Sequence, residues 1–186
     1  NGAGKSTLLR TLSNVQQPLS GEVKLCGENI ENISPRELAQ KISAVFTDKT
    51  MAGGLTVAEV VALGRHPYTG FFGKITKEDN EIISMALSLV GMEQQSKKYL
   101  YQLSDGERQK VMIAKALAQQ TPLVVLDEPT AFLDLPSRVE ILYLLRRLAD
   151  EQGKAILLST HDIEQSLSVA DRSEERRVGK ECWCSC

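Results

Sequence analysis

Hydrophobic residues follow two different spacings along the chain, and the two spacings alternate. Apolar runs at residues 42–46, where Ser43 is the one polar residue, 123–126 and 155–158 are typical of strands. Around them, apolar residues recur every three or four positions, which indicates helices. The clearest helical faces are formed by Ile82, Ile83, Ala86, Leu87 and Val90, and by Ile141, Leu144, Leu145 and Leu148. Strands that alternate with helices predict an α/β fold with a parallel sheet.

Cap and turn residues indicate where individual elements begin and end. The Ser-Pro pair at residues 34–35 predicts a helix start, because serine caps a first turn and proline suits the first helical position. Gly91 predicts the end of a helix, and a strand at residues 21–25 should turn at Gly27. From about residue 56 to 103 the pattern is helical without strands. We therefore expect a helical segment inserted into the α/β unit.

The apolar run at 123–126 is followed directly by two carboxylates. Asp127 could hold a magnesium ion through water, and Glu128 could orient or deprotonate an attacking water. Both roles are needed for hydrolysis at a phosphate. A chance acidic pair is the alternative, since parallel strands commonly end in polar residues at the carboxyl edge of their sheet.

The chain opens with the latter part of the P-loop pattern G-x-x-x-x-G-K-[ST]. The matching residues are Asn1, Gly2, Ala3, Gly4, Lys5, Ser6 and Thr7. Backbone N–H groups and a helix N-terminus surround a phosphate in such a loop, where Lys5 would reach the β- and γ-phosphates and Ser6 would ligate magnesium. A glycine-rich helix start with a solvated lysine is the alternative, and the acidic pair downstream disfavours it. The opening glycine of the pattern would lie two positions before Asn1, so we expect the natural protein to extend upstream.

Composition is that of a soluble globular domain, with 42% hydrophobic residues, 25% charged residues and a formal net charge of −2 over 186 residues. Because there is no basic excess, nucleic acid is not an expected partner. The sequence has no run of about eighteen apolar residues, the length that would be needed to span a membrane.

The last fifteen residues differ in character from the rest. Three of the four cysteines lie between residues 182 and 186, and neither a histidine nor a C-x-x-C pair accompanies them, so a metal site is not expected there. With one choice of codons, residues 172–182 translate a common short-read sequencing adapter. We therefore expect the natural protein to stop being represented near Asp171. The fourth cysteine, Cys26, is expected to be a small strand residue of a reduced cytosolic protein.

A third motif stands at residues 103–109, which read Leu-Ser-Asp-Gly-Glu-Arg-Gln and precede an apolar-striped helix. Together with the P-loop and the acidic pair, it resembles the signature motif of ATP-binding cassette (ABC) ATPases, in the form Leu-Ser-Gly-Gly-Glu-Arg-Gln. The resemblance implies that Ser104, Gly106 and Glu107 contact ATP bound by a partner subunit. Ser104 and Asp105 are also good helix caps, and a capping role is compatible with this function because a helix N-terminus attracts anions.

The resemblance implies a RecA-like P-loop NTPase core of the α/β class, with an antiparallel β layer and an inserted helical subdomain. ATP and Mg²⁺ are the implied cofactors, with Ser6 and Asp127 as metal ligands. The chain would divide into the N-terminal part of the core, the helical subdomain, the signature helix with the rest of the core, and a non-native tail, at residues 1–55, 56–103, 104–171 and 172–186.

Two shorter matches extend the resemblance. Residues 131–134, Ala-Phe-Leu-Asp, follow the Pro-Thr turn as the family's D-loop does, which makes Asp134 a candidate for contact across a dimer. Residues 156–162 are an apolar strand that leads to His161, which resembles the family's catalytic switch histidine at the γ-phosphate. An ordinary polar strand end is the alternative for this histidine.

The sequence also departs from the family pattern. The family usually has a glutamine after the strand that leads into its helical subdomain, and Thr47 occupies that Q-loop position here, followed by Asp48. A threonine hydroxyl reaches magnesium or attacking water less directly than a glutamine amide. Coupling through this loop is then either weakened at Thr47 or uses Asp48. Asp105 replaces the first signature glycine. This replacement is tolerable if the Asp105 side chain points outward.

Residues 62–73 contain Gly64, Arg65 and Pro67 followed by aromatic residues and glycines. The segment resembles the ATPases of bacterial importers for iron-siderophore, haem and cobalamin, although a helix end and turn with buried aromatics is the alternative. The resemblance implies an ATP-hydrolysing subunit at the cytoplasmic face of the bacterial membrane. It would work as a homodimer or with a paired ATPase subunit, on two membrane permease subunits, and indirectly with a periplasmic or surface substrate-binding protein. A soluble ABC protein acting on ribosomes and an inactive fragment are the alternatives.

Overall fold

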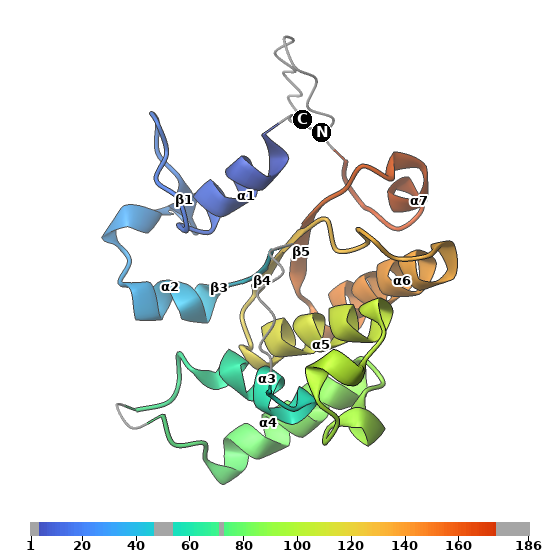
Figure 1. Cartoon of the computed structure of the whole chain (residues 1–186). Helices are drawn as coiled ribbons and strands as arrows, with labels where there is room; N and C mark the ends of the chain where they lie inside the picture. Colours follow the sequence, from blue (N-terminus) through green and yellow to red (C-terminus); the bar gives the residue numbers. More distant parts are fainter. Residues whose placement is uncertain (1–3, 47–53, 71–72, 174–186) are drawn as a thin grey trace.

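The computed structural model has a parallel sheet with helices on both faces and a small antiparallel strand pair beside it (Figure 1). It describes residues 4–46, 54–70 and 73–173. The α/β class and the antiparallel β pair expected from the sequence are confirmed by this arrangement.

The parallel sheet has the order β3 (Ile42–Val45), β4 (Leu123–Asp127), β5 (Ala155–Ser159). The three predicted apolar strands are confirmed, and the last two each extend by one residue, to a polar end. In the parallel register Asp127 lies opposite Ser159. The carboxyl ends of the two neighbouring strands therefore meet at one edge of the sheet, where α/β folds commonly bind ligands.

α1 (Lys5–Leu12) and α2 (Pro35–Lys41) pack against one face of the sheet. The Ser34 hydroxyl accepts a hydrogen bond from the Glu37 N–H, which caps α2 as predicted. Apolar side chains from these helices meet the face of β4 to which Val125 points. This smaller core consists of Leu9, Ile30, Ile33, Leu38, Ile42 and Val125.

β1 (Lys24–Leu25) and β2 (Glu28–Asn29) form the antiparallel pair and lead into a 3₁₀ turn, η1 (Ile30–Asn32). The pair is shorter than the strand expected at residues 21–25. Gly21 has a φ of 85°, in the left-handed region, so the strand does not include it. Cys26, expected as a strand residue, instead lies exposed in the turn between β1 and β2, with a φ of 52°.

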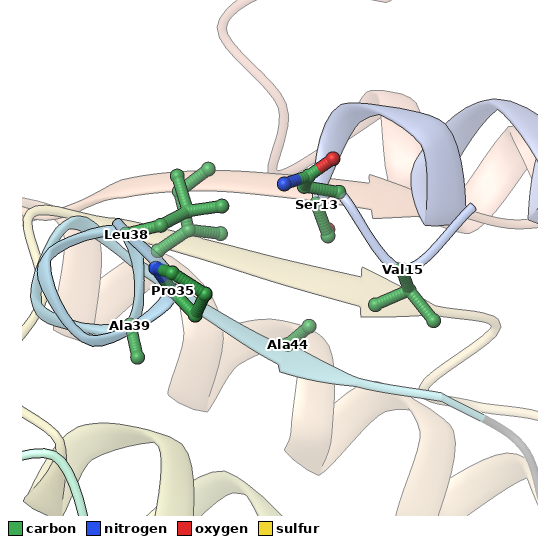
Figure 2. A pocket seen from close by; sticks show the side chains of 8 residues that line it. Ser13, Val15, Pro35, Leu38, Ala39 and Ala44 are labelled. Carbon is green, nitrogen blue, oxygen red and sulfur yellow. The ribbon is translucent and has the colours of Figure 1, made fainter. Parts of the chain in front are cut away.

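A shallow apolar hollow separates the C-terminal end of α1 from α2 (Figure 2). Its lining residues are Ser13, Asn14, Val15, Pro35, Leu38, Ala39, Ile42 and Ala44. Ile42 and Ala44 contribute to the lining, so the hollow lies over β3.

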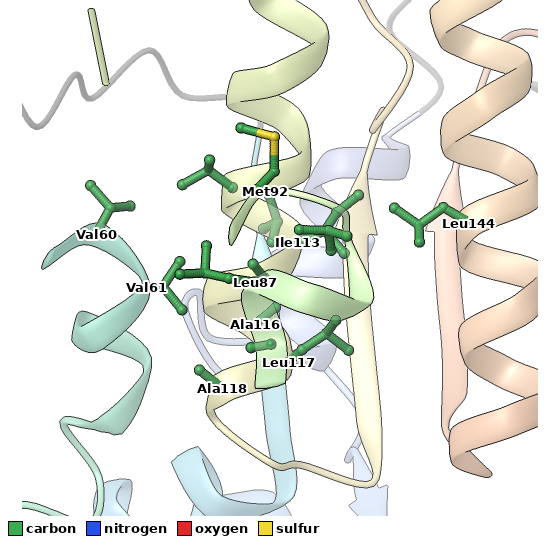
Figure 3. Packing of buried hydrophobic residues seen from close by; sticks show 14 of the residues in the cluster. Val60, Val61, Leu87, Met92, Ile113, Ala116, Leu117, Ala118 and Leu144 are labelled. Atoms are coloured by element: carbon green, nitrogen blue, oxygen red, sulfur yellow. The ribbon is translucent and has the colours of Figure 1, made fainter. Parts of the chain in front are cut away.

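α5 (Asp105–Ala118) and α6 (Leu135–Gln152) cover the other face, and α3 (Val57–Ala62) and α4 (Lys77–Leu89) pack on α5. Side chains from all four helices meet in the larger core (Figure 3). The predicted helical faces are buried in it, including Val111, Ile113, Ala114, Leu117 and Ala118 of α5, Ile83, Ala86 and Leu87 of α4, and Ile141, Leu144, Leu145 and Leu148 of α6. Each fully buried Val, Ile or Leu side chain stabilises the fold by about 1.5–3 kcal/mol.

The turn η2 (Leu63–Arg65) fixes the helical segment to the end of α5. A Cβ added to Gly64 would lie 2.2 Å from the backbone oxygen of Lys115, so only glycine allows this close approach. The adjoining backbone is held from the other side, since Arg36 Nε of α2 donates to the Pro67 carbonyl at 2.9 Å. The segment that resembles chelate importers is thus also a packing element.

Arg65 is buried, with 5% of its surface exposed, and its guanidinium is surrounded by acceptors. Its Nε donates to Asp79 Oδ1 at 2.7 Å, and its Nη1 donates to the Ala118 carbonyl at 2.7 Å. The Tyr68 ring lies 4.1 Å from the guanidinium carbon. The backbone N–H of Thr76, followed by the Arg65 guanidinium, lowers the pKa of Asp79. A buried charge thereby gains a charged partner and hydrogen bonds.

The remaining elements are the turns η3 (Glu93–Gln95) and η4 (Leu100–Gln102) and the short helix α7 (Ile163–Leu167). Among the described residues from 56 to 103, the only β contact is an isolated bridge between Thr56 and Tyr99, so the expected strand-free segment is confirmed there. Within the described ranges, none of the helices is both long enough and apolar enough to cross a membrane.

Candidate active site

Three elements bring polar side chains to the carboxyl edge of the sheet. β4 and β5 supply their last residues, and α1 begins beside them, after Gly4. Gly4 has a φ of 72°, a left-handed conformation that glycine adopts without strain, and it sets the direction in which α1 starts. α1 packs against both strands, so its first turn lies at this edge.

Asp127 is the buried acid of the site, with 5% of its surface exposed. Its Oδ1 accepts a hydrogen bond from Ser6 Oγ at 3.1 Å and another from Ser159 Oγ at 2.7 Å. The parallel pairing of Asp127 with Ser159 explains the second contact. The first joins residues 121 positions apart in the chain.

Glu128 leaves the strand through a left-handed turn, with a φ of 49°. Its backbone N–H donates to the carbonyl of Ser159 at 3.1 Å and to Ser159 Oγ at 3.0 Å, which holds the turn in place. Its Oε2 lies 3.4 Å from Nδ1 of His161. The Glu128 side chain is 25% exposed, so solvent reaches this carboxylate more readily than it reaches Asp127. Backbone strain of this kind occurs often at functional sites.

Lys5 points to the end of β5, where its Nζ donates to the carbonyl of Thr160 at 2.8 Å. A phosphate oxygen is a stronger acceptor for an ammonium group than a neutral carbonyl. The Ser6 hydroxyl and the Asp127 carboxylate are hard oxygen donors close to one another. They fit Mg²⁺, which is usually held by one or two protein oxygens together with water and phosphate oxygens.

The signature residues lie at the start of α5 and make local contacts. Ser104 and Glu107 form a capping box, in which Glu107 Oε2 accepts from the Ser104 N–H and hydroxyl, both at 2.9 Å. The Ser104 backbone N–H lowers the pKa of Glu107. Asp105 points outward, with 67% of its side chain exposed, and pairs with Arg108 at 3.0 Å. Gly106 faces α6, and an added Cβ would lie 3.2 Å from Ser137 Oγ.

The expected site residues fall into three groups. The structure brings Gly4, Lys5, Ser6, Asp127, Glu128 and His161 together at one edge of the sheet. It places Thr7 on the exposed side of α1, Ser104, Gly106 and Glu107 on α5, and Asp134 at the exposed N-cap position of α6. Asn1, Gly2, Ala3, Thr47 and Asp48 lie outside the described residues, as does most of the 172–186 tail.

Two residues of the site were missed by sequence reasoning. Ser159 donates from its hydroxyl to Asp127, the last residue of β4, and accepts the backbone N–H of Glu128. Its place at the end of an apolar strand was the available signal. Arg138 donates from Nη1 to Asp162 at 2.9 Å and from Nε to the carbonyl of Leu133 at 2.7 Å. A helical arginine between two loops carries no sequence signal, because both of its partners are reached only through the fold.

Comparison with known proteins agrees with these features. An uncharacterised ABC transporter ATP-binding protein of Methanocaldococcus jannaschii is 46% identical over 172 residues, which cover 92% of this chain and 59% of that relative. The iron(3+)-hydroxamate import ATP-binding protein FhuC of Bacillus subtilis is 43% identical over 166 residues, covering 89% of this chain and 62% of the relative. The chain thus spans about three fifths of the length of these two relatives.

Solved structures and the family model extend the comparison. A transporter assigned to the metal-chelate type, in an inward-facing conformation, superposes with a TM-score of 0.79 at 31% identity, covering 92% of this chain and 64% of that one. A dimeric ATP-binding cassette in a post-hydrolysis state with ADP and Pi gives a TM-score of 0.74 at 31% identity, covering 89% and 73%. The ABC transporter family model matches residues 1–131, and the chain therefore belongs to the ABC transporter family.

Proposed function

We propose that the protein is the ATP-hydrolysing subunit of an ABC importer for an iron chelate, haem or cobalamin. The observation that carries the ATPase part is the convergence of Lys5, Ser6, Asp127 and Glu128 at one sheet edge. A cation, two magnesium-type oxygen donors and a second, more accessible carboxylate are the groups that hydrolysis of a nucleoside triphosphate requires.

Each of these residues has a distinct task in this proposal. Bound ATP with Mg²⁺ supplies the transferable γ-phosphoryl group and neutralises part of its charge. Lys5 offsets the charge of the β- and γ-phosphates, and the Ser6 and Asp127 oxygens hold the metal. Glu128 orients water and accepts its proton, while His161 stands beside it toward the γ-phosphate.

The Q-loop and signature residues have tasks of their own. Thr47 or Asp48 takes over the water-ordering role that glutamine has in the family. Ser104, Gly106 and Glu107 face ATP held by a second ATPase subunit, and Asp134 contacts that subunit. Dimerisation is supported by the dimeric cassette with ADP and Pi to which this chain is similar.

The importer part rests on similarity. The FhuC relative carries an iron(3+)-hydroxamate import name, and one structural neighbour is of the metal-chelate type. Residues 62–70 support the cargo class less strongly than their sequence alone would, because Gly64 and Arg65 have packing roles. The protein would sit at the cytoplasmic face of the bacterial membrane against two permease subunits, and act indirectly with a substrate-binding protein. Purification with two membrane proteins supports this reading, whereas purification with ribosomes contradicts it.

The ATPase assignment is tested by Glu128→Gln in the full-length protein. The amide keeps the shape of the side chain but cannot accept a proton, so ATP turnover should fall roughly 10²–10⁴-fold while ATP binding is retained. Glu140→Gln is the matched control, because Glu140 is an exposed glutamate of α6 that pairs with Lys110 of α5. Near-normal hydrolysis by Glu128→Gln would remove Glu128 from the mechanism. An unmodified protein that hydrolyses no ATP would overturn the proposed function itself.

A further inference from the structure

Two loops carry the groups proposed for catalysis, and they are joined at their near ends. The carboxylate loop (residues 128–134) follows β4 and begins with Glu128. The histidine loop (residues 160–162) follows β5 and contains His161. Ser159 joins the two where they leave the sheet, since its carbonyl and its hydroxyl both accept the Glu128 N–H. This first joint is a direct result of strand pairing.

A second joint lies at the far ends of the same loops. Arg138, on the first turn of α6, donates from Nε to the Leu133 carbonyl at 2.7 Å, at the end of the carboxylate loop. From Nη1 it donates to Asp162 Oδ2 at 2.9 Å, at the end of the histidine loop. Strand pairing does not reach this far, so Arg138 supplies the connection that the sheet cannot.

The second joint has the properties of a strong contact. The side chains of Arg138 and Asp162 are 29% and 20% exposed, so water screens the pair only in part. Both bonds come from a guanidinium, whose planar fork fixes the two donor directions relative to one another. The Asp162 N–H also donates to Thr160 Oγ1 at 3.0 Å, and the Thr160 carbonyl accepts Lys5. The histidine loop is therefore held by contacts on both sides of His161.

We propose that Arg138 is a positioning residue that clamps the carboxylate loop to the histidine loop and thereby fixes Glu128 relative to His161. The inference deepens the proposed function and rests on it for its effect on catalysis. Within the described part of the chain, the Arg138 side chain bonds to Leu133 and Asp162 and not to Lys5, Ser6, Asp127, Glu128 or His161. It fixes the backbone of both loops at their far ends and so keeps Glu128 Oε2 3.4 Å from His161 Nδ1.

The clamp predicts a specific change in local opening, which hydrogen exchange measures without reference to activity. In Arg138→Gln, amide exchange should quicken in both loops, about tenfold or more, while the amides of β4 stay protected. Arg146→Gln is the matched control, since Arg146 lies on the same helix and also pairs with aspartates, Asp150 and Asp171, away from both loops. It should leave exchange in the two loops unchanged.

The effect on catalysis is measured in the full-length protein. Arg138→Gln should lower kcat for ATP hydrolysis roughly 10–100-fold, as a small misplacement of reacting groups does, and should change KM by less than about twofold. Arg138→Lys keeps the positive charge but lacks the planar guanidinium, so its kcat should lie between those of the unmodified protein and Arg138→Gln. Because Arg138 and Asp162 act as one contact, adding Asp162→Asn to Arg138→Gln should cause little further loss.

The outcomes separate the clamp from the function on which it rests. If exchange in both loops is unchanged in Arg138→Gln, the clamp is wrong, whatever the ATPase assay shows. If exchange in Arg138→Gln quickens throughout the domain, Arg138 stabilises the fold generally and the positioning role is overturned. The same conclusion follows if exchange throughout the domain quickens as much in Arg138→Lys as in Arg138→Gln. If exchange in the two loops quickens in Arg138→Gln but the unmodified protein hydrolyses no ATP, the clamp is retained and the proposed function is contradicted.

Discussion

Replacing Arg65 by Met should destabilise the protein strongly, because it removes one partner of a buried ion pair. The change keeps most of the side-chain volume and the packing against Tyr68. It leaves the buried Asp79 without its cation and the Ala118 carbonyl without the Arg65 donor. Asp79 still accepts from the Thr76 N–H and hydroxyl, at 3.0 and 2.9 Å, which offsets part of the loss.

The size of the effect follows from the burial of the pair. Removing one partner of a buried pair costs about 3–5 kcal/mol, whereas an exposed pair contributes roughly 0–1 kcal/mol. A domain is typically stable by about 5–15 kcal/mol, so Arg65→Met should remove roughly a fifth or more of the free energy of unfolding. With a urea slope of about 2 kcal/mol per M, the unfolding midpoint should fall by roughly 1.5–2.5 M.

Urea unfolding followed by circular dichroism measures this shift. The double variant Arg65→Met with Asp79→Leu removes both charges and should recover much of the loss. Arg146→Met, at an exposed pair on α6, is the control and should leave the midpoint in place. A loss below about 1 kcal/mol for Arg65→Met, the scale of a surface pair, would refute the reasoning.

Three further predictions follow from other contacts. Gly64→Ala should destabilise the domain by about 1–3 kcal/mol or more in the same assay, because its Cβ would overlap the Lys115 carbonyl; an unchanged midpoint would mean that the turn moves away from α5 freely. Because Asp79 has a lowered pKa in the folded state, its contribution to stability is present above its ordinary value, about 3.9, and is lost as pH falls below it. Stability measured from pH 6 to pH 2 should therefore fall less steeply in Asp79→Asn, and parallel curves would contradict the assignment. Mixing Lys5→Ala protomers with Ser104→Arg protomers should restore ATPase activity lost in each alone, and a heterodimer that stays inactive would argue against sites shared between subunits.

The elements of the fold could be predicted wherever one physical cue decided them. The Ser34 cap with proline after it predicted α2, and apolar runs predicted β3, β4 and β5. For the central strand β4 the run reflects burial, whereas β5 has Ala155 and Leu157 exposed. The candidate chemistry of Lys5, Ser6, Asp127 and Glu128 was also readable, since each stands in a short motif with a fixed relation to a strand or helix.

Contacts between distant residues could not be predicted in the same way. Nothing near Arg65 in the sequence indicates that its guanidinium would meet the carbonyl of Ala118, 53 positions away. Likewise, Arg138 meets Asp162 only because the fold places the first turn of α6 beside the loop that follows β5. The sequence suggested an outward Asp105 as a condition for function, and the structure meets that condition through the pair with Arg108.

The site is assembled from opposite ends of the chain, which ties its existence to complete folding. Ser6 reaches Asp127 across 121 positions and Lys5 reaches Thr160 across 155. Closing chain segments of this length is entropically costly and comes late for topologies rich in non-local contacts. Partly folded forms would therefore lack the proposed phosphate site altogether. A ligand that binds there selects the native state alone, so saturating nucleotide should raise the melting temperature of the whole domain, and nucleotide binding reports on global folding.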